Sequence, residues 1–290
     1  MDLHSLNLLP PTFLSHGSPM TALDGREAGA FWATLGATLG DGLLREGPMP
    51  RRVLAVSAHS LTREPVLLGA AHHEAVYDFG GFDPQLHTLR YDAPGAPALA
   101  ERVQALLRDA GLPVHRVDEG GLDHGIWVPL RFALPAADVP VLPLAWPPDW
   151  SPARLFALGE ALAPLAGEDV WIVGSGSITH NLPRVFGSGL RPPVDQPATP
   201  ESTAFRDWWA ARSAEADWPA LFDYRRQAPF AELMHPSDEH LLPWFVAAGA
   251  GGRLHGAVRV HQSLTYGDLG MDAYAFGAAA ERLGALLTKA

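Results

Sequence analysis

Three histidines of this chain each follow an apolar run, and imidazole both binds metals and moves protons near neutral pH. His16 and His59 come directly after the apolar residues 12–15 and 53–58, and His180 follows a longer run of the same kind. The sequence holds 13 histidines and no cysteine. Disulfides, cysteine zinc sites and thiol nucleophiles are therefore excluded, and a bound metal would need His, Asp or Glu ligands.

A lone histidine after a strand is more often a hydrogen-bonded loop residue than a ligand. Several of them in loops rich in glycine and serine favour a mononuclear metal centre built from histidine. His124 lies between two glycines in the motif Gly-Leu-Asp-His-Gly, where the backbone can approach a ligand closely. His235 and His240 flank a Pro-Ser-Asp-Glu segment, and we expect Glu239 and His240 to face solvent or to support His235.

The elements that must position these residues are short strands and amphipathic helices. Apolar runs without polar alternation are typical of strands covered on both faces. We expect such strands at 12–15, 53–58, 66–70, 139–145, 170–173 and 257–260. Apolar spacing and cap signals predict helices at 96–110, 151–166, 200–215 and about 236–248.

The alternation of strands and helices along the chain predicts an α/β fold, with a central, largely parallel or mixed sheet flanked by helices. We find no repeat and no linker, so residues 1–290 are expected to form a single domain. Ligands of open α/β sheets bind beyond the carboxyl ends of the strands. Because His16, His59 and His180 follow such ends, we expect them to converge on a metal site at that edge.

The charge of the chain limits its partners. It has 32 acidic and 21 basic residues, for a net charge of −11 with neutral histidine. An acidic surface repels nucleic acid and anionic lipid, so neither is expected as a partner. No apolar run is long enough to span a membrane, and residues 1–11 lack the basic start of a signal peptide. We expect a cytoplasmic protein, a monomer or a small homo-oligomer.

Two further motifs are ambiguous. The Gly-Ser-Gly-Ser segment at 174–177 has the start of a dinucleotide loop, but Thr179 stands where the third glycine belongs. The segment Tyr-Asp-Phe-Gly-Gly-Phe at 77–82 fits either an aromatic lid over a site or a packed turn.

Taken together, the motifs resemble those of the 4,5-DOPA extradiol dioxygenase group of the class III (LigB-type) ring-cleavage dioxygenases. The resemblance extends from about residue 10 to 277. In chain order it rests on Ser-His-Gly-Ser-Pro at 15–19, Ser-Ala-His at 57–59, the aromatic segment at 77–82, Leu-Asp-His-Gly-Ile-Trp at 122–127, Gly-Ser-Gly-Ser-Ile-Thr-His-Asn-Leu at 174–182, His-Pro-Ser-Asp-Glu-His-Leu-Leu-Pro at 235–243 and Met-Asp-Ala-Tyr at 271–274.

The resemblance implies a non-haem Fe(II) enzyme that opens the ring of a small, DOPA-like catechol with O₂, inserting both oxygen atoms. It implies His16, His59 and His235 as metal ligands, and His180 as either the acid–base catalyst or a fourth ligand. His124 would contact substrate or oxygen from the second sphere. Zn(II) is an alternative occupant of a purified sample, because imidazole sites bind it more tightly than Fe(II).

The resemblance also bears on the substrate-binding residues, for which we expect Tyr77, Phe79, Ser60 and His124. Ser60 stands where many relatives carry Trp, a change that would widen the pocket. Two other functions use the same histidines. One is a zinc hydrolase with a metal-bound water as nucleophile, and the other is a non-enzymatic metal-binding relative.

Overall fold

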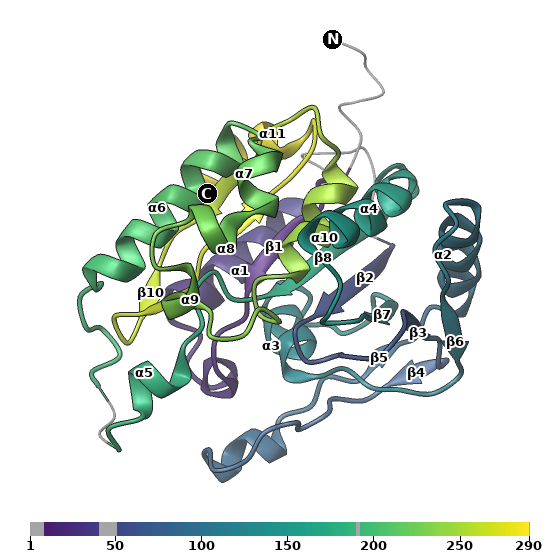
Figure 1. The fold of residues 1–290 in the computed structure, drawn as a ribbon. Coiled ribbons are helices and arrows are strands. Elements are labelled where there is room, and N and C mark those ends of the chain that lie inside the picture. Colours follow the sequence, from purple (N-terminus) through teal and green to yellow (C-terminus); the bar gives the residue numbers. More distant parts are fainter. Residues whose placement is uncertain (1–8, 41–50, 190–191, 290) are drawn as a thin grey trace.

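The computed structural model describes residues 9–40, 51–189 and 192–289. Its central feature is an eight-stranded sheet with the strand order β6-β3-β7-β2-β8-β1-β12-β9 (Figure 1). These strands are β1 (Thr12–Ser15), β2 (Arg52–Ser57), β3 (Val66–Leu68), β6 (His115–Val117), β7 (Val141–Ala145), β8 (Val170–Gly176), β9 (Val258–His261) and β12 (Ala273–Ala275). Two small two-stranded sheets pair β4 (His72–His73) with β5 (Ala93–Pro94) and β10 (Leu264–Thr265) with β11 (Leu269–Gly270).

The middle of the large sheet is parallel. Strand β2 pairs in parallel with both β7 and β8, and β8 pairs in parallel with β1. Outside this group the sheet is mixed, because β3 runs antiparallel to β7, and β12 runs antiparallel to β1 and β9. The carboxyl ends of β1, β2 and β8 therefore open at the same edge of the sheet.

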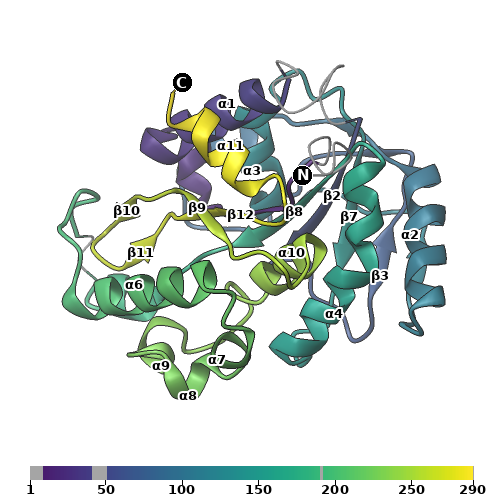
Figure 2. The ribbon, with the colours of Figure 1, turned by 90° about the horizontal axis from the view of Figure 1, so that it is seen from above.

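Helices cover both faces of the sheet (Figure 2). They are α1 (Arg26–Gly40), α2 (Pro97–Asp109), α3 (His124–Ala133), α4 (Pro152–Leu162), α5 (Leu182–Phe186), α6 (Pro200–Ala214), α7 (Trp218–Phe222), α8 (Tyr224–Gln227), α9 (Ala231–Met234), α10 (Pro243–Gly251) and α11 (Ala280–Leu287). Side chains that alternate along β2 supply two separate cores. Leu54 and Val56 pack with residues of α2, α4 and α10, whereas Val53 and Ala55 pack with residues of α1, α3 and α11.

The predicted α/β class, with a mixed sheet flanked by helices, is confirmed. Each strand expected from an apolar run overlaps an observed strand, with bounds that differ by a few residues. Two helix starts follow the predicted cap signals. The side chains of Ser151 and Thr199 accept backbone N–H hydrogen bonds at the starts of α4 and α6.

The helix expected from about residue 236 begins later. Helix α10 starts at Pro243, in the first-turn position where proline needs no hydrogen-bond partner for its nitrogen. Residues 235–242 form a non-helical segment ahead of it. Sequence patterns also missed the short strand β12 and the helix α1, and they placed His124 in a turn although it is the first residue of α3.

Among the described residues, no helix is both long enough and apolar enough to cross a membrane. The expectation about residues 1–11 concerns mainly residues 1–8, which lie outside the described part of the chain.

A buried ion pair links α6 to Asp272, the residue directly before β12. Arg206 donates from Nε and Nη2 to the two carboxylate oxygens of Asp272, at 2.7 and 2.9 Å, and both side chains are buried. The Asp272 carbonyl in turn accepts the hydroxyl of Ser15 at 2.8 Å. The pair therefore supports the end of β1, next to His16.

We predict that Asp272→Asn lowers the free energy of unfolding by about 3–5 kcal/mol, because it leaves the Arg206 charge buried and unpaired. Urea denaturation measures this loss. The matched control is Glu168→Gln, which removes the same kind of charge from the exposed Arg102–Glu168 pair and should cost below about 1 kcal/mol. Equal losses in the two variants would contradict the structural role given to Asp272.

Candidate metal centre and substrate cavity

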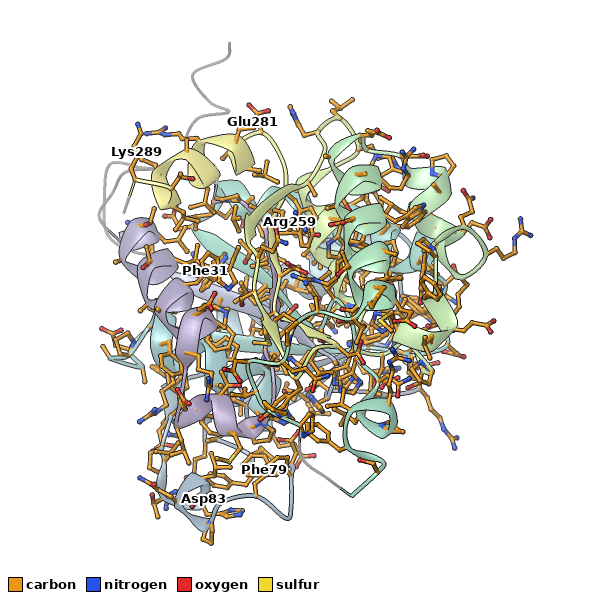
Figure 3. The ribbon with its side chains drawn as sticks, turned by 90° about the vertical axis from the view of Figure 1, so that its left-hand side faces the viewer. Phe31, Phe79, Asp83, Arg259, Glu281 and Lys289 are labelled. Carbon is orange, nitrogen blue, oxygen red and sulfur yellow. The ribbon has the colours of Figure 1, made fainter. Side chains whose placement is uncertain are left out.

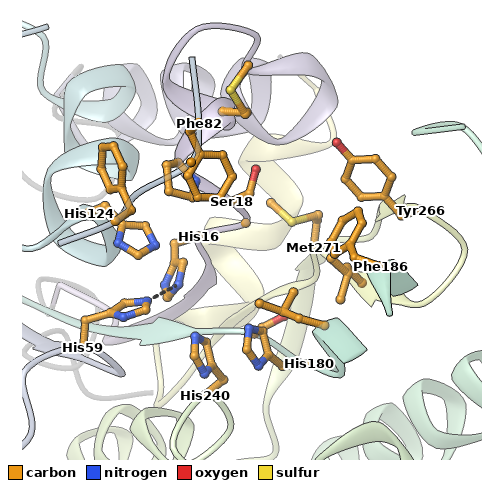
Figure 4. Close-up of a pocket in the computed structure, with 18 residues that line it drawn as sticks. His16, Ser18, His59, Phe82, His124, His180, Phe186, His240, Tyr266 and Met271 are labelled. Atoms are coloured by element: carbon orange, nitrogen blue, oxygen red, sulfur yellow. Dashed lines mark hydrogen bonds between the residues drawn. The ribbon is translucent and has the colours of Figure 1, made fainter. Parts of the chain in front are cut away.

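His16 and His59 face each other at the carboxyl ends of β1 and β2. The His16 N–H donates to the carbonyl of Gly176, the last residue of β8, at 2.9 Å. His59 follows Ala58, whose N–H donates to the Ser175 carbonyl at 2.9 Å. The two Nε2 atoms lie 3.1 Å apart, as the dashed line in Figure 4 shows. Two of the three histidines predicted to converge thus stand at the same end of β8.

His240 joins them from the non-helical segment before α10. Its carbonyl accepts the Ser177 N–H at 2.8 Å, which fixes this segment against the end of β8. A Cβ atom on Gly176 would lie 1.9 Å from the same carbonyl, so the close approach requires glycine there. Ring nitrogens of His16, His59 and His240 all lie within 4.8 Å of one another.

Polar partners on the outer side of these rings leave their Nε2 atoms for the centre. The hydroxyl of Ser175 donates to the Gly125 carbonyl, so it accepts the Nδ1 proton of His16 at 3.0 Å. Nδ1 of His240 donates to Glu239 Oε1 at 3.1 Å. Nδ1 of His59 lies 3.6 Å from a carboxylate oxygen of Asp78. Such outer partners fix the tautomer of metal-binding histidines.

This geometry fits a mononuclear metal ion. Imidazole nitrogens bind Zn²⁺ at about 2.0–2.1 Å, so two of them at a right angle lie about 3 Å apart. The 3.1 Å separation of the His16 and His59 Nε2 atoms matches this value. Two lone pairs at such a distance repel unless a proton or a cation lies between them. Imidazole donors suit zinc and iron among other metals, and the geometry alone does not separate these two.

Burial favours the neutral form of His16 and His59, the form that metal binding requires. Desolvation, reinforced by the neighbouring histidines, holds the pKa of His16 well below its ordinary value. The same causes, in the same order, lower the pKa of His59 to about 3. For Glu239, the hydrogen bond from His240 is the main cause that lowers the pKa to about 2. The carboxylate therefore stays ionised behind His240.

His235 does not join the group, contrary to the expectation from the resemblance. Its ring is fully buried, its Nε2 donates to the Ile178 carbonyl at 2.8 Å, and Phe205 lies against it. Burial lowers the pKa of His235 to about 4. His240, expected to face solvent or to support His235, stands beside His16 and His59 instead. The reason is the late start of α10, since the bends and turns of residues 235–242 bring only the second histidine of this segment to the sheet edge.

His180 stands beside this group rather than within it. Its ring stacks on that of His240, with centroids 3.5 Å apart and planes 9° apart. Desolvation, followed by the influence of His240, lowers the pKa of His180 to about 2. Nitrogen atoms of His180 and His240 and an oxygen of Glu239 also lie within 4.8 Å of one another. His180 therefore borders the centre on the side of β8.

His124 borders the centre on the opposite side, and Asp78 holds it there. The His124 backbone N–H and ring Nδ1 both lie 3.0 Å from Asp78 Oδ1, and Nδ1 is equally close to Oδ2. The His124 ring centroid lies 4.0 Å from that of His59. Burial would raise the pKa of Asp78, but the hydrogen bonds from His124 outweigh it and lower the pKa. The sequence analysis missed Asp78 as a supporting residue, although it lies inside the aromatic motif.

Ser60 supports His59 instead of facing the substrate cavity. The hydroxyls of Ser57 and Ser60 each donate to one carboxylate oxygen of the buried Asp123, both at 2.6 Å. Because these serines lie on either side of His59, Asp123 clamps the turn that carries it. Burial raises the pKa of Asp123.

A cavity of about 360 Å³ opens onto the histidine rings (Figure 4). His16, His59, His124, His180 and His240 form its polar wall. Phe79 also lines it, as expected, and with Phe82 it belongs to the segment that carries Asp83 at the lower edge of the molecule in Figure 3. Tyr77 does not line the cavity. Its hydroxyl instead donates to the Leu89 carbonyl at 2.5 Å.

Known proteins resemble this chain over most of its length. Residues 11–277 match the family described as the catalytic LigB subunit of aromatic ring-opening dioxygenase. The chain belongs to the LigB family. It is 35% identical over 274 residues to the 4,5-DOPA dioxygenase extradiol of Beta vulgaris, covering 93% of this chain and 97% of that protein. It is 34% identical over 248 residues to the protein of that name from Escherichia coli K12, covering 83% and 85%.

A solved structure has the same overall fold. The crystal structure of an uncharacterized protein from Escherichia coli K12 superposes with a TM-score of 0.72 at 29% identity, over 93% of this chain and 100% of that one. The predicted family and the predicted class of enzyme, a ring-opening dioxygenase among the oxidoreductases, are confirmed. The assignment favours this activity over the zinc hydrolase and over a non-enzymatic binding protein.

The two histidines of the 235–240 motif can be told apart by metal binding. We predict that His240→Ala lowers the metal content and affinity at least about 10-fold, since it removes one of three ligands. His235→Ala should retain the metal while losing thermal stability. Metal analysis after dialysis, together with competition against a chromophoric chelator, measures both. Loss of metal in His235→Ala, with full retention in His240→Ala, would restore the assignment drawn from the resemblance.

Proposed function

We propose that this chain is a non-haem Fe(II)-dependent extradiol dioxygenase that cleaves the ring of a small substituted catechol with O₂. The observation that carries the proposal is the group of His16, His59 and His240, whose ring nitrogens meet at one end of a closed-in, ring-lined cavity. Fe(II) held by three histidines would offer open coordination positions to both catechol oxygens and to O₂, and it would pass electrons from the catechol to O₂. The ring-opening family to which the chain belongs supports the same reaction.

The protein's own residues would bind and orient the diol. The cavity is within the size range of small-molecule sites and holds one aromatic ring with a short substituent. Phe79 and Phe82 lie over it as part of the segment 77–82, and they would exclude water from the bound ring. This is the lid interpretation of that segment, whose first residue, Tyr77, is anchored by its hydroxyl to the Leu89 carbonyl.

His180 is proposed as the acid–base catalyst. It lines the cavity beside His240, and a neutral imidazole there can accept a proton from a substrate hydroxyl and return it to the opened product. His124 is proposed to orient the substrate or oxygen. Its Nδ1 is committed to Asp78, so its Nε2 is the nitrogen that remains for the ligand.

The direct test is oxygen consumption after anaerobic loading with Fe(II). We predict stoichiometric O₂ uptake with at least one member of a panel of substituted catechols, together with a yellow ring-opened product identified by mass. Zinc-loaded protein is the matched control and should show neither signal, because Zn²⁺ has no redox chemistry. Verified iron occupancy without turnover across the panel would refute the proposal.

The role of His180 is tested separately. We predict that His180→Ala keeps its bound iron but lowers kcat about 10²–10⁴-fold, the usual contribution of a positioned acid–base group. Iron content and the kinetics of O₂ uptake are measured on the same sample. The exposed His115, which pairs with Glu64 on the surface, supplies the control variant His115→Ala with unchanged activity. Loss of the metal in His180→Ala would instead assign His180 as a fourth ligand.

A further inference from the structure

The wall of the cavity away from His59 is apolar. Leu182 and Phe186 reach it from α5, Leu269 from β11, and Met271 from the turn that follows β11. Figure 4 shows Met271, Phe186 and Tyr266 gathered on that side, opposite His59 and His124. A substituent on a ring whose hydroxyls face the histidines would point toward this wall.

No Lys, Arg, Asp or Glu belongs to the cavity lining within the described ranges. Apart from the histidines, its polar side chains are those of Ser18, Ser177 and Tyr266. The Ser177 hydroxyl is already engaged, because it donates to the Thr179 carbonyl at 2.7 Å. Among the residues that the structure describes, the lining therefore offers no formal charge of either sign to pair with a charged substituent.

Several charged residues beside this lining in the described chain are paired with other groups. Arg184 lies on α5 between two lining residues, but it donates to Asp268 at 2.7 Å and to Glu201 at 3.2 Å. Arg206 and Asp272 form the buried pair described above. The carboxylates of Asp78 and Glu239 are likewise held behind the rings of His124 and His240.

An ionised carboxylate or ammonium group that leaves water without a partner is strongly disfavoured, whereas apolar carbon gains from the same transfer. We propose that the substrate of this enzyme is a catechol with a neutral, apolar substituent, and that catechols with a charged substituent are poor substrates. The amino-acid side chain of DOPA, the compound in the names of the curated relatives, belongs to the disfavoured class. The inference rests on the proposed function and narrows its substrate class.

A panel matched in shape tests the charge preference. The iron-loaded enzyme is assayed with 4-propylcatechol, with 3-(3,4-dihydroxyphenyl)propanoate, with dopamine and with L-DOPA. We expect kcat/KM for the neutral compound to exceed that for each charged one by at least about 10-fold. A kcat/KM for L-DOPA equal to or above that for 4-propylcatechol overturns the inference while leaving the dioxygenase proposal intact.

Binding to the metal-free protein provides a readout that does not depend on turnover. Calorimetry compares 4-propylphenol with 3-(4-hydroxyphenyl)propanoate, which differ in charge but not in ring. Tighter binding of the neutral phenol supports the inference even when no catechol is turned over, the result that would refute the dioxygenase proposal. Equal or tighter binding of the anion, or no binding of the neutral phenol, overturns it.

A positive charge introduced at the rim of the cavity should change the enzyme's preference between neutral and anionic catechols. Leu182 lines the cavity and is 41% exposed, so Leu182→Arg places a cation there without burying it. We expect this variant to raise kcat/KM for the propanoate relative to 4-propylcatechol by several-fold. Leu254, 92% exposed and outside the cavity, supplies the control Leu254→Arg with an unchanged ratio. An unchanged ratio in Leu182→Arg would contradict the proposal that the substituent of the bound catechol points toward this apolar wall.

Discussion

The parallel pairing of β1 and β2 with β8 sets the positions of the histidines that face the cavity. Ser15 is paired with Gly176 and Ser57 with Ser175, so the three strands end at nearly the same level. Both flanking chains then turn above the end of β8, one carrying His16 and the other His59. A one-residue change of register would send every side chain of the shifted strand to the opposite face of the sheet. Strand register, more than loop structure, therefore determines where the histidines of the candidate metal centre lie.

The sequence predicted the parts of the centre that depend on local order. His16 and His59 follow buried strands, and the rule that ligands gather at the carboxyl ends of strands was enough to bring them together. The choice between His235 and His240 depends on contacts that no local pattern records. It is decided by the start of α10 at Pro243 and by the absence of a side chain at Gly176, more than fifty residues away.

Supporting residues were harder to predict than the ligands. Ser60 was expected to contact substrate because it follows His59, but its hydroxyl is committed to Asp123 from another part of the chain. The supporting role of Asp78 was not predicted, because this residue lies within an aromatic motif. It holds His124 through three hydrogen-bond contacts. A short polar side chain can face either of two sides, and only the packed fold decides which. The fold class and ligand type were predictable, whereas the roles of individual polar neighbours were not.

The clamp formed by Asp123 across Ser57 and Ser60 makes the turn that carries His59 depend on a side chain from a distant part of the chain. With His59 held by this clamp and His16 by Ser175, hydrogen bonds within the folded chain help to place both rings. In a zinc finger, by contrast, the ion itself drives the fold. A substitution at Asp123 would therefore disturb His59 without changing any nitrogen that faces the cavity.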